Sequence, residues 1–313
     1  MAEVTVVVPT HNRMTLLRLT LRSLLGQRGV DLEVVVVDDG SSDGSEQMVR
    51  AIGDPRLRLI RHTVAQRVSA ARNRGLAEAG GEWVAFCDDD DLWAPDKLRR
   101  QLDAARAEGR QWAYAGVVNV GRDLRILSLA PLPGPAEVVA GLRRYNAVPG
   151  GGSNVVAHRS LLERVGPFDV RLRNTEDWEL WLRLAGEGPP ACAPAPLVAY
   201  RVHGGNASLD VAEIVAGVAL IQRRHGIRVD RGFIHRWLAE SCLRSGNRAA
   251  ALRHFALAAV SGQAAGVARD LAVLGRRRLG MPARARGGSD AAWRLEAGAW
   301  LARLADQDAD DAP

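Results

Sequence analysis

The chain has few cysteines and lacks long apolar runs. Its three cysteines, Cys87, Cys192 and Cys242, are odd in number and have no metal-site spacing, which excludes a disulfide framework and indicates reduced, partly buried thiols. No run approaches the roughly 18 to 20 apolar residues of a membrane-spanning helix. The N-terminus leads directly into a predicted strand without a basic, cleavable leader, so we expect a cytoplasmic protein.

Two phosphate-binding fingerprints are also missing. A Gly-x-Gly-x-x-Gly motif after the first predicted strand would indicate a dinucleotide enzyme, and none occurs there. The chain has no P-loop either. Metal ions and side chains must therefore bind any phosphate that this protein recognises.

What is present is the composition of a folded, basic protein. With 313 residues, 47% of them hydrophobic, the chain can bury the core of one large domain or two small ones. The formal charge of +6 comes largely from arginine and suits phosphates, nucleic acid or an acidic membrane face. Arginine-rich and alanine-rich composition also follows from genome bias, so we do not expect nucleic acid as a partner.

The first hundred residues alternate between β-rich and helical patterns. Strands are predicted at 4–8, 32–37, 56–61 and 82–87, with helices between them and a further helix beginning at Pro95. Strands that are apolar on both faces favour an α/β fold with a mostly parallel sheet flanked by helices. Ligands of such sheets bind beyond the carboxyl ends of the strands.

Four consecutive aspartates, Asp88–Asp91, follow the buried run 83–86. An exposed acidic run is usually solvated, but this one is fixed at the end of a buried strand. Like charges held so close raise one another's pKa unless a cation neutralises them. Hard divalent cations such as Mg²⁺ or Mn²⁺ bind carboxylates and bridge them to phosphates. We therefore predict a metal–phosphate site, in preference to a helix-capping or turn cluster.

Polar residues also end the first two predicted strands. Thr10 follows the first strand, and Asp38 and Asp39 follow the second, so all three should lie at the same edge as the aspartate run. The two aspartates can cap the next helix, or they can accept hydrogen bonds from a base or ribose. Arg13 and Arg72 are candidate partners for the same nucleotide.

Asp177 is a candidate general base. On a helix starting near Thr175 it should point inward beside two tryptophans, and partial desolvation would raise its pKa toward a useful value. Glu176 shares the opposite stripe with Glu179 and is expected to face solvent. The alternative is that Asn174 caps the helix and that Asp177, at the third position of the helix, serves only as the partner in this capping interaction.

A lone histidine, His203, follows the last predicted strand, 197–202, and precedes a glycine-rich turn. Such a histidine is more often structural than a ligand. Its position beyond a strand, where the other polar clusters are expected, leaves both interpretations open.

Several ordered motifs together resemble family 2 glycosyltransferases of the GT-A fold. The resemblance covers residues 3 to about 206 and rests on segments 6–13, 36–43, 70–75, 86–93, 166–169, 176–183 and 200–203. It implies inverting transfer of a sugar from a nucleotide diphosphate donor, most often UDP-linked, to an acceptor hydroxyl, with Mn²⁺ or Mg²⁺ as the metal. The acceptor could be a polysaccharide, a lipid-linked saccharide, a peptide or a small natural product.

The resemblance also implies roles for individual residues. The donor nucleotide would be held by Pro9, Thr10, Arg13, Asp39, Arg72 and Asp88. Asp90 would bind the metal with His203 nearby, and Asp177 would be the catalytic base. The donor-sugar and acceptor pocket would include Asp89, Gly152, Ser153, Asn154, Glu176 and Trp178. One departure is Gln66-Arg67, which stands where the family usually has a glycine.

Two other functions use similar features. A nucleotidyltransferase on a similar sheet would need acidic metal ligands but not an inward Asp177. A non-catalytic nucleotide-sugar-binding protein would carry a degenerate site, and the intact aspartate run and Glu176-Asp177 pair argue against it.

Beyond residue 209 the pattern is helical with no strand signal. We therefore predict a catalytic domain at 1–208 and a helical region at 209–313, with a helical hairpin near 235–259, a basic segment at 276–288 and an acidic tail. This region could form a homodimer, or bring the protein to the inner face of a membrane through its arginines. We expect it instead to pack on the catalytic domain.

Overall fold

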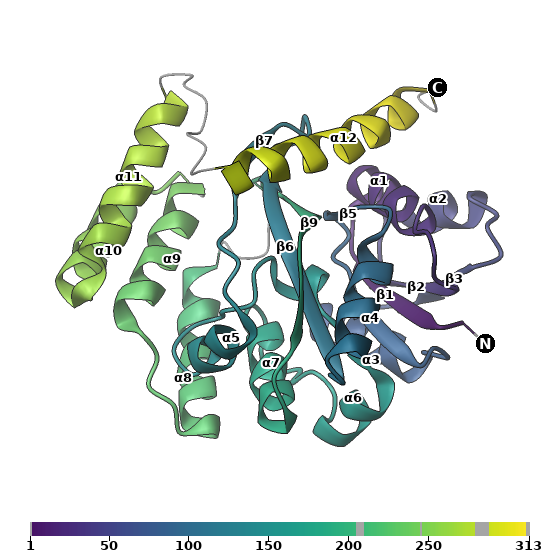
Figure 1. The fold of residues 1–313 in the computed structure, drawn as a ribbon, viewed down its shortest axis with the longest axis horizontal. Helices are drawn as coiled ribbons and strands as arrows, with labels where there is room; N and C mark the ends of the chain where they lie inside the picture. Colours follow the sequence, from purple (N-terminus) through teal and green to yellow (C-terminus); the bar gives the residue numbers. More distant parts are fainter. Residues whose placement is uncertain (1, 205–209, 245, 279–287, 311–313) are drawn as a thin grey trace.

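The computed structural model describes residues 2–204, 210–244, 246–278 and 288–310. Its centre is a nine-stranded sheet with the order β3-β2-β1-β4-β8-β6-β9-β5, and β7 pairs with β6 at the side of this path. Helices surround the sheet, and the C-terminal helices lie along one side and across one end of it (Figure 1).

The first half of the sheet is parallel, as predicted. Its elements are β1 (Val4–Thr10), α1 (Met14–Leu25), β2 (Leu32–Asp38), α2 (Ser45–Ala51), β3 (Leu57–Arg61), α3 (Val68–Ala77) and β4 (Trp83–Phe86). β1 pairs in parallel with both β2 and β4. β1, β2 and β4 are buried along almost their whole length, as expected for strands covered by helices on both faces. The edge strand β3 is only half-buried, and its two arginines are exposed.

The second half of the sheet is mixed. Its elements are β5 (Leu92–Trp93), α4 (Lys97–Ala107), β6 (Trp112–Val120), β7 (Ile126–Leu129), α5 (Pro135–Leu142), η1 (Gly151–Asn154), β8 (Val156–His158), α6 (Arg159–Val165), α7 (Glu176–Glu187) and β9 (Ala191–Arg201). β6 and β9 are parallel, whereas β8 is antiparallel to β4 and β6. The helix α4 begins at Lys97 rather than at the predicted Pro95, whose carbonyl accepts a bond from Arg28.

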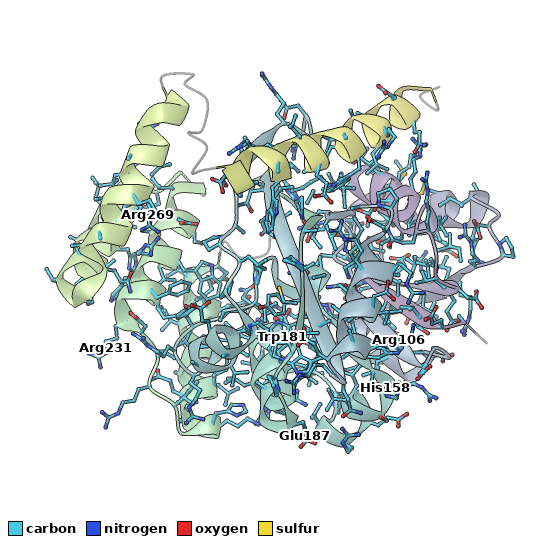
Figure 2. The ribbon with its side chains drawn as sticks, viewed as in Figure 1. Arg106, His158, Trp181, Glu187, Arg231 and Arg269 are labelled. Carbon is cyan, nitrogen blue, oxygen red and sulfur yellow. The ribbon has the colours of Figure 1, made fainter. Side chains whose placement is uncertain are left out.

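Side chains from alternate strand positions form two cores. Val7 and Phe86 belong to the core beneath α5, α6 and α7, whereas Val6 and Ala85 belong to the core beneath α1 and α4. Trp181 of α7 lies in the densely packed interior of the first core (Figure 2). The two layers of helices fix the strands from both sides, and the strand ends are thereby held in place.

The described part of the C-terminal region is helical, as predicted. It contains α8 (Val211–His225), α9 (Arg231–Arg244), α10 (Arg248–Ala258), the π-helical turn η3 (Ala259–Gln263), α11 (Ala264–Arg278) and α12 (Gly288–Asp310). α9 and α10 form the expected hairpin. Residues 279–287 of the basic segment, and the last residue of the acidic tail, lie outside the described residues.

The last helix, α12, packs back onto the sheet across β9 and β7 and beside α1 (Figure 1). Trp300 is buried there, and its indole N–H donates to the carbonyl of Pro196 at 3.2 Å. Gly116 of β6 leaves room for Trp293, since a Cβ at Gly116 would lie 2.3 Å from that ring. These contacts show that α12 packs on the sheet, and the domain boundary at residue 208 stays a prediction.

Within the described residues, no helix combines the length and the apolar character that crossing a bilayer requires. Cys87 and Cys192 are free thiols, and Cys87 and Cys242 are buried.

Candidate active site

A cavity of about 730 Å³ opens at the carboxyl ends of the parallel strands. The register explains its position, because Thr10 at the end of β1 pairs with Asp38 of β2, and Val7 of β1 pairs with Phe86 of β4. Most of the predicted site residues line this cavity: Pro9, Thr10, Arg13, Asp39, Arg72, Asp88, Asp89, Asp90, Gly152, Glu176, Asp177 and Trp178.

The aspartate run after β4 is held by bonds from several elements. Asp89 accepts a hydrogen bond from the hydroxyl of Thr10 at 2.7 Å. Asp90 accepts from Arg13, and its Oδ2 lies 3.0 Å from Nε2 of His203. The backbone N–H of Arg201 donates to Asp91 at 3.1 Å. His203 therefore lies behind Asp90, although it does not itself line the cavity.

Three of these carboxylates could hold a divalent cation. Oxygens of Asp88, Asp90 and Asp91 lie within 4.8 Å of one another, and Asp88 is the most exposed of the three. Oδ2 of Asp91 is buried and has no hydrogen-bond partner. An all-oxygen set of carboxylates is the chemistry that Mg²⁺ and Mn²⁺ prefer, so the residues present fit such an ion.

The charges in the run are unequally compensated. Burial, and next the charge of Asp90, raise the pKa of Asp89 to about 7. Burial also raises the pKa of Asp91 well above its usual range. Burial alone would raise the pKa of Asp90 too, but the hydrogen bond from His203 and the charge of Arg13 hold it below its ordinary value. A bound cation would relieve the remaining repulsion.

Arg72 of α3 joins the aspartate run to the start of α7. One of its nitrogens lies 2.5 Å from Oδ1 of Asp88, and another lies 2.7 Å from Oε1 of Glu176. The guanidinium is 5.3 Å from the centre of the Phe168 ring, and the side chain is almost completely buried. One arginine thus fixes both acidic walls of the cavity.

Asp177 faces the cavity from the first turn of α7. Its Oδ2 accepts a hydrogen bond from the amide of Asn146 at 3.0 Å. Burial, and next the charge of Glu176, raise its pKa to about 7. The capping alternative is wrong, because Thr175 occupies the cap position and Asn174 donates instead to Glu213 at 3.1 Å.

The prediction that Glu176 and Glu179 face solvent is wrong. Glu176 pairs with Arg72, and Glu179 is fully buried among Arg183, Arg224 and His225. Pairing with cations and hydrogen bonding offset the cost of burying these carboxylates. Glu176 consequently lines the cavity with Asp177.

Ser153 and Asn154 do not reach the cavity, contrary to the prediction. Both are fully buried. The hydroxyl of Ser153 accepts a bond from the N–H of Asp88, and Asn154 bonds the N–H and the carbonyl of Ala115. These bonds fix the turn η1 against Asp88 and β6, so that Gly152 is the one of the three predicted residues that lines the cavity.

Asp39 holds the loop before α3. Its carboxylate accepts hydrogen bonds from the N–H groups of Gln66 and Arg67, and it contacts His62 at 2.7 Å. Arg67 has φ +77°, in the left-handed region that favours glycine. The departure from the family pattern noted at this position therefore falls on a strained residue.

The sequence analysis did not identify the cavity residues contributed by α9 and by the loop after α5. Asn146, Phe233, Arg236, Trp237 and Glu240 also line the cavity. The α9 residues have helical spacing along one face, but this pattern alone does not distinguish a cavity wall from a core.

Comparison with known proteins identifies the family. Residues 5–166 match the sequence model described as Glycosyl transferase family 2, more than half of the chain. Succinoglycan biosynthesis protein ExoO of Rhizobium meliloti (strain 1021) is 37% identical over 217 residues, 66% of this chain and 62% of that protein. This chain thus spans less than two thirds of that relative.

Another relative is the UDP-Glc:alpha-D-GlcNAc-diphosphoundecaprenol beta-1,3-glucosyltransferase WfaP of Escherichia coli. It is 27% identical over 212 residues, which cover 66% of this chain and 80% of that protein.

Solved structures share the fold. S. aureus TarS 1-349 in complex with UDP-GlcNAc has a TM-score of 0.57 at 17% identity, covering 90% of this chain and 93% of that one. Mannosyltransferase PcManGT from Pyrobaculum calidifontis, in complex with GDP-Man and Mn²⁺, has a TM-score of 0.51 at 22% identity, covering 99% and 88%. The chain belongs to glycosyl transferase family 2 and has the GT-A fold.

Proposed function

We propose that this protein is a metal-dependent, inverting glycosyltransferase that moves a sugar from a nucleotide diphosphate sugar to a hydroxyl group of a lipid-linked saccharide. One observation carries the proposal: a single cavity joins a cluster of metal-type carboxylates to a carboxylate whose pKa is raised to about 7. A metal ion held by the carboxylate cluster would bind a diphosphate leaving group, and the carboxylate with the raised pKa would remove a proton near neutral pH.

The donor would lie along the ends of the parallel strands. Thr10, Arg13, Asp39 and Arg72 line the cavity and would hold the nucleobase end of the donor, while Asp88 would face the ribose. Asp90 and the carboxylates beside it would hold Mn²⁺ or Mg²⁺, with His203 supporting Asp90. When bound, such an ion offsets negative charge on a departing phosphate.

The chemistry at the other side of the site is proton removal. Asp177 would accept the proton of the acceptor hydroxyl. At the same time the oxygen of that hydroxyl would form a bond to the anomeric carbon of the donor, and the nucleoside diphosphate would leave. The transition state has oxocarbenium character. Attack opposite the leaving group inverts the configuration at that carbon. Asn146 would keep Asp177 directed into the cavity through its 3.0 Å hydrogen bond.

The names of relatives support the choice of substrates. WfaP is named for a UDP-Glc donor and a diphosphoundecaprenol-linked acceptor, and a 38% identical segment of 94 residues occurs in a Campylobacter jejuni glucosyltransferase named for a PP-undecaprenol-linked saccharide. That segment covers 29% of this chain and 30% of that protein. We therefore propose a UDP-linked donor and a lipid-linked acceptor, which would bring this protein to the cytoplasmic face of a membrane.

The products test the proposal. The protein would be incubated with UDP-sugars, Mn²⁺ and an alkyl-diphosphate-linked N-acetylglucosamine, and the products separated by chromatography. We expect free UDP and a new glycoside whose anomeric configuration, by proton NMR, is opposite to that of the donor. Release of a sugar 1-phosphate, with the uridine monophosphate group transferred to the acceptor, would indicate a nucleotidyltransferase instead. Retained configuration would contradict the inverting mechanism.

A further inference from the structure

Helix α9 presents a stripe of side chains to the cavity. Phe233, Arg236, Trp237 and Glu240 all line it and are half-buried. Their spacing of three, four and seven residues puts them on one face of a helix. They lie outside residues 5–166, so the match to the family does not account for them. Arg231, in contrast, lies at the outer edge of the molecule (Figure 2).

The start of α9 is fixed to the loop that follows α5. The N–H of Asp230 donates to the carbonyl of Arg144 at 2.8 Å, and the two side chains pair at 2.9 Å. Asp230 also accepts a bond from the N–H of Phe233 at 2.9 Å, as a helix-capping residue does. The position of the stripe is therefore set by the same loop that contacts the catalytic carboxylate.

A continuous series of contacts leads from that loop to the site. Tyr145 stacks on Phe233 with ring centres 4.3 Å apart. The next residue, Asn146, donates to Asp177. A Cβ on Gly151 would lie 3.1 Å from Oδ2 of Asp177. Two consecutive residues of this loop thus link the stripe to Asp177, and the aspartates at the strand ends line the same cavity.

One residue of the stripe is held by the neighbouring helix, and Asn146 beside the stripe has an unused hydrogen-bond acceptor. Arg236 is held by Asp270 of α11 through two bonds of 2.8 and 2.9 Å, so α11 braces the wall. Oδ1 of Asn146 is buried without a hydrogen-bond partner. Buried polar atoms in proteins are normally paired, so this oxygen indicates a donor group that enters the cavity.

Aromatic rings with a few placed polar groups form a suitable wall for a sugar ring. We propose that the α9 stripe is the acceptor subsite, in which Phe233 and Trp237 pack on the terminal sugar of the acceptor and Asn146 accepts a hydrogen bond from one of its hydroxyls. This inference rests on the proposed function, since it places the hydroxyl that Asp177 deprotonates.

The test separates acceptor binding from donor chemistry. Trp237→Ala, Trp237→Phe and wild type would be compared in transfer to alkyl-diphosphate-linked N-acetylglucosamine and N-acetylgalactosamine, and in hydrolysis of the UDP-sugar by water. The matched control is Leu252→Ala on α10, whose side chain is 67% exposed and does not line the cavity.

We expect Trp237→Ala to raise the acceptor KM by at least about tenfold and to leave donor affinity and donor hydrolysis unchanged. Trp237→Phe should restore most of the loss, and the control should match wild type. An unchanged acceptor KM, or an equal loss of transfer and hydrolysis, would overturn the inference. Wild type that hydrolyses the donor but transfers to neither probe would also overturn it, whereas wild type that neither binds nor hydrolyses any donor would contradict the proposed function.

Discussion

Nη1 of Arg72 lies 2.7 Å from Oε1 of Glu176, and both side chains are buried. Because Arg72 also binds Asp88, one buried side chain joins the aspartate run to the first turn of α7. Glu176 in turn adds to the negative field at Asp177, after burial the largest cause of its raised pKa.

Replacing Glu176 by glutamine should therefore shift the pH dependence of turnover. The substitution removes the charge that raises the pKa of Asp177, so the base becomes deprotonated at lower pH. We expect the acidic limb of the kcat profile to move to lower pH in Glu176→Gln, measured by release of nucleoside diphosphate. Glu163→Gln, on the surface of α6, is the control, and an identical profile in Glu176→Gln and wild type would refute the coupling.

Asp177 should control turnover without controlling donor binding. In wild type the carboxylate acts as a base only when deprotonated, so activity should rise with pH through about 7. Asp177→Asn should lower kcat by about 10²- to 10⁴-fold and leave the donor affinity measured by calorimetry intact. A mutant with normal kcat would remove Asp177 from the mechanism.

Asp90 should control the response to metal. Removing one carboxylate from the set with Asp88 and Asp91 should weaken Mn²⁺ affinity by at least about 10- to 100-fold, measured as the Mn²⁺ dependence of donor binding in Asp90→Ala. The control Asp103→Ala changes a largely exposed aspartate on α4. If the two variants show the same Mn²⁺ dependence, the metal assignment is wrong.

Gly152 should tolerate no side chain. A Cβ there would lie 2.7 Å from Nη2 of Arg72 and would disturb its bond to Asp88. The displaced Arg72 would no longer hold Asp88 in place in the cavity, so we expect Gly152→Ala to weaken donor binding by about tenfold or more. Gly186→Ala on α7 is the matched control, because a Cβ at Gly186 meets nothing within 4 Å. Equal donor affinity in both variants would contradict this geometry.

The helix α12 should stabilise the catalytic sheet. Trp300 is 3% exposed and packs with Ala297, Leu301 and Leu304 against β6 and β9. Trp300→Ala should lower the free energy of unfolding by about 3–5 kcal/mol, measured by urea denaturation. Leu295→Ala, on the same helix but 76% exposed, should change it little. Similar stabilities for the two variants would show that α12 does not support the sheet.

The parallel half of the fold could be predicted because its strands contain continuous apolar runs, such as Val34–Val37. The second half of the sheet was harder to predict from the sequence. β5 is only two residues long, and the first part of β9 contains Pro194 and Pro196, which weaken any strand pattern. The alternation of strands and helices also says nothing about the antiparallel pairing of β8.

The candidate site was predictable where residues follow strands directly, as Thr10 and Asp88–Asp91 do. Burial of Glu176 and Glu179 was not, because Arg72 and Arg224 reach them from distant parts of the chain, and helical spacing alone carries no information about such partners. The α9 wall was hidden for the same reason. Its aromatic stripe is equally typical of a helix that packs on a core.

The most direct test of the central claim is calorimetric titration of the wild-type protein with a panel of UDP-, TDP- and GDP-sugars, each with Mn²⁺ and with EDTA. We predict that at least one donor, most readily a UDP-sugar, binds with Mn²⁺ and loses affinity in EDTA. Absence of binding by every donor, or equal binding in EDTA, would contradict a metal-dependent nucleotide-sugar site in this cavity.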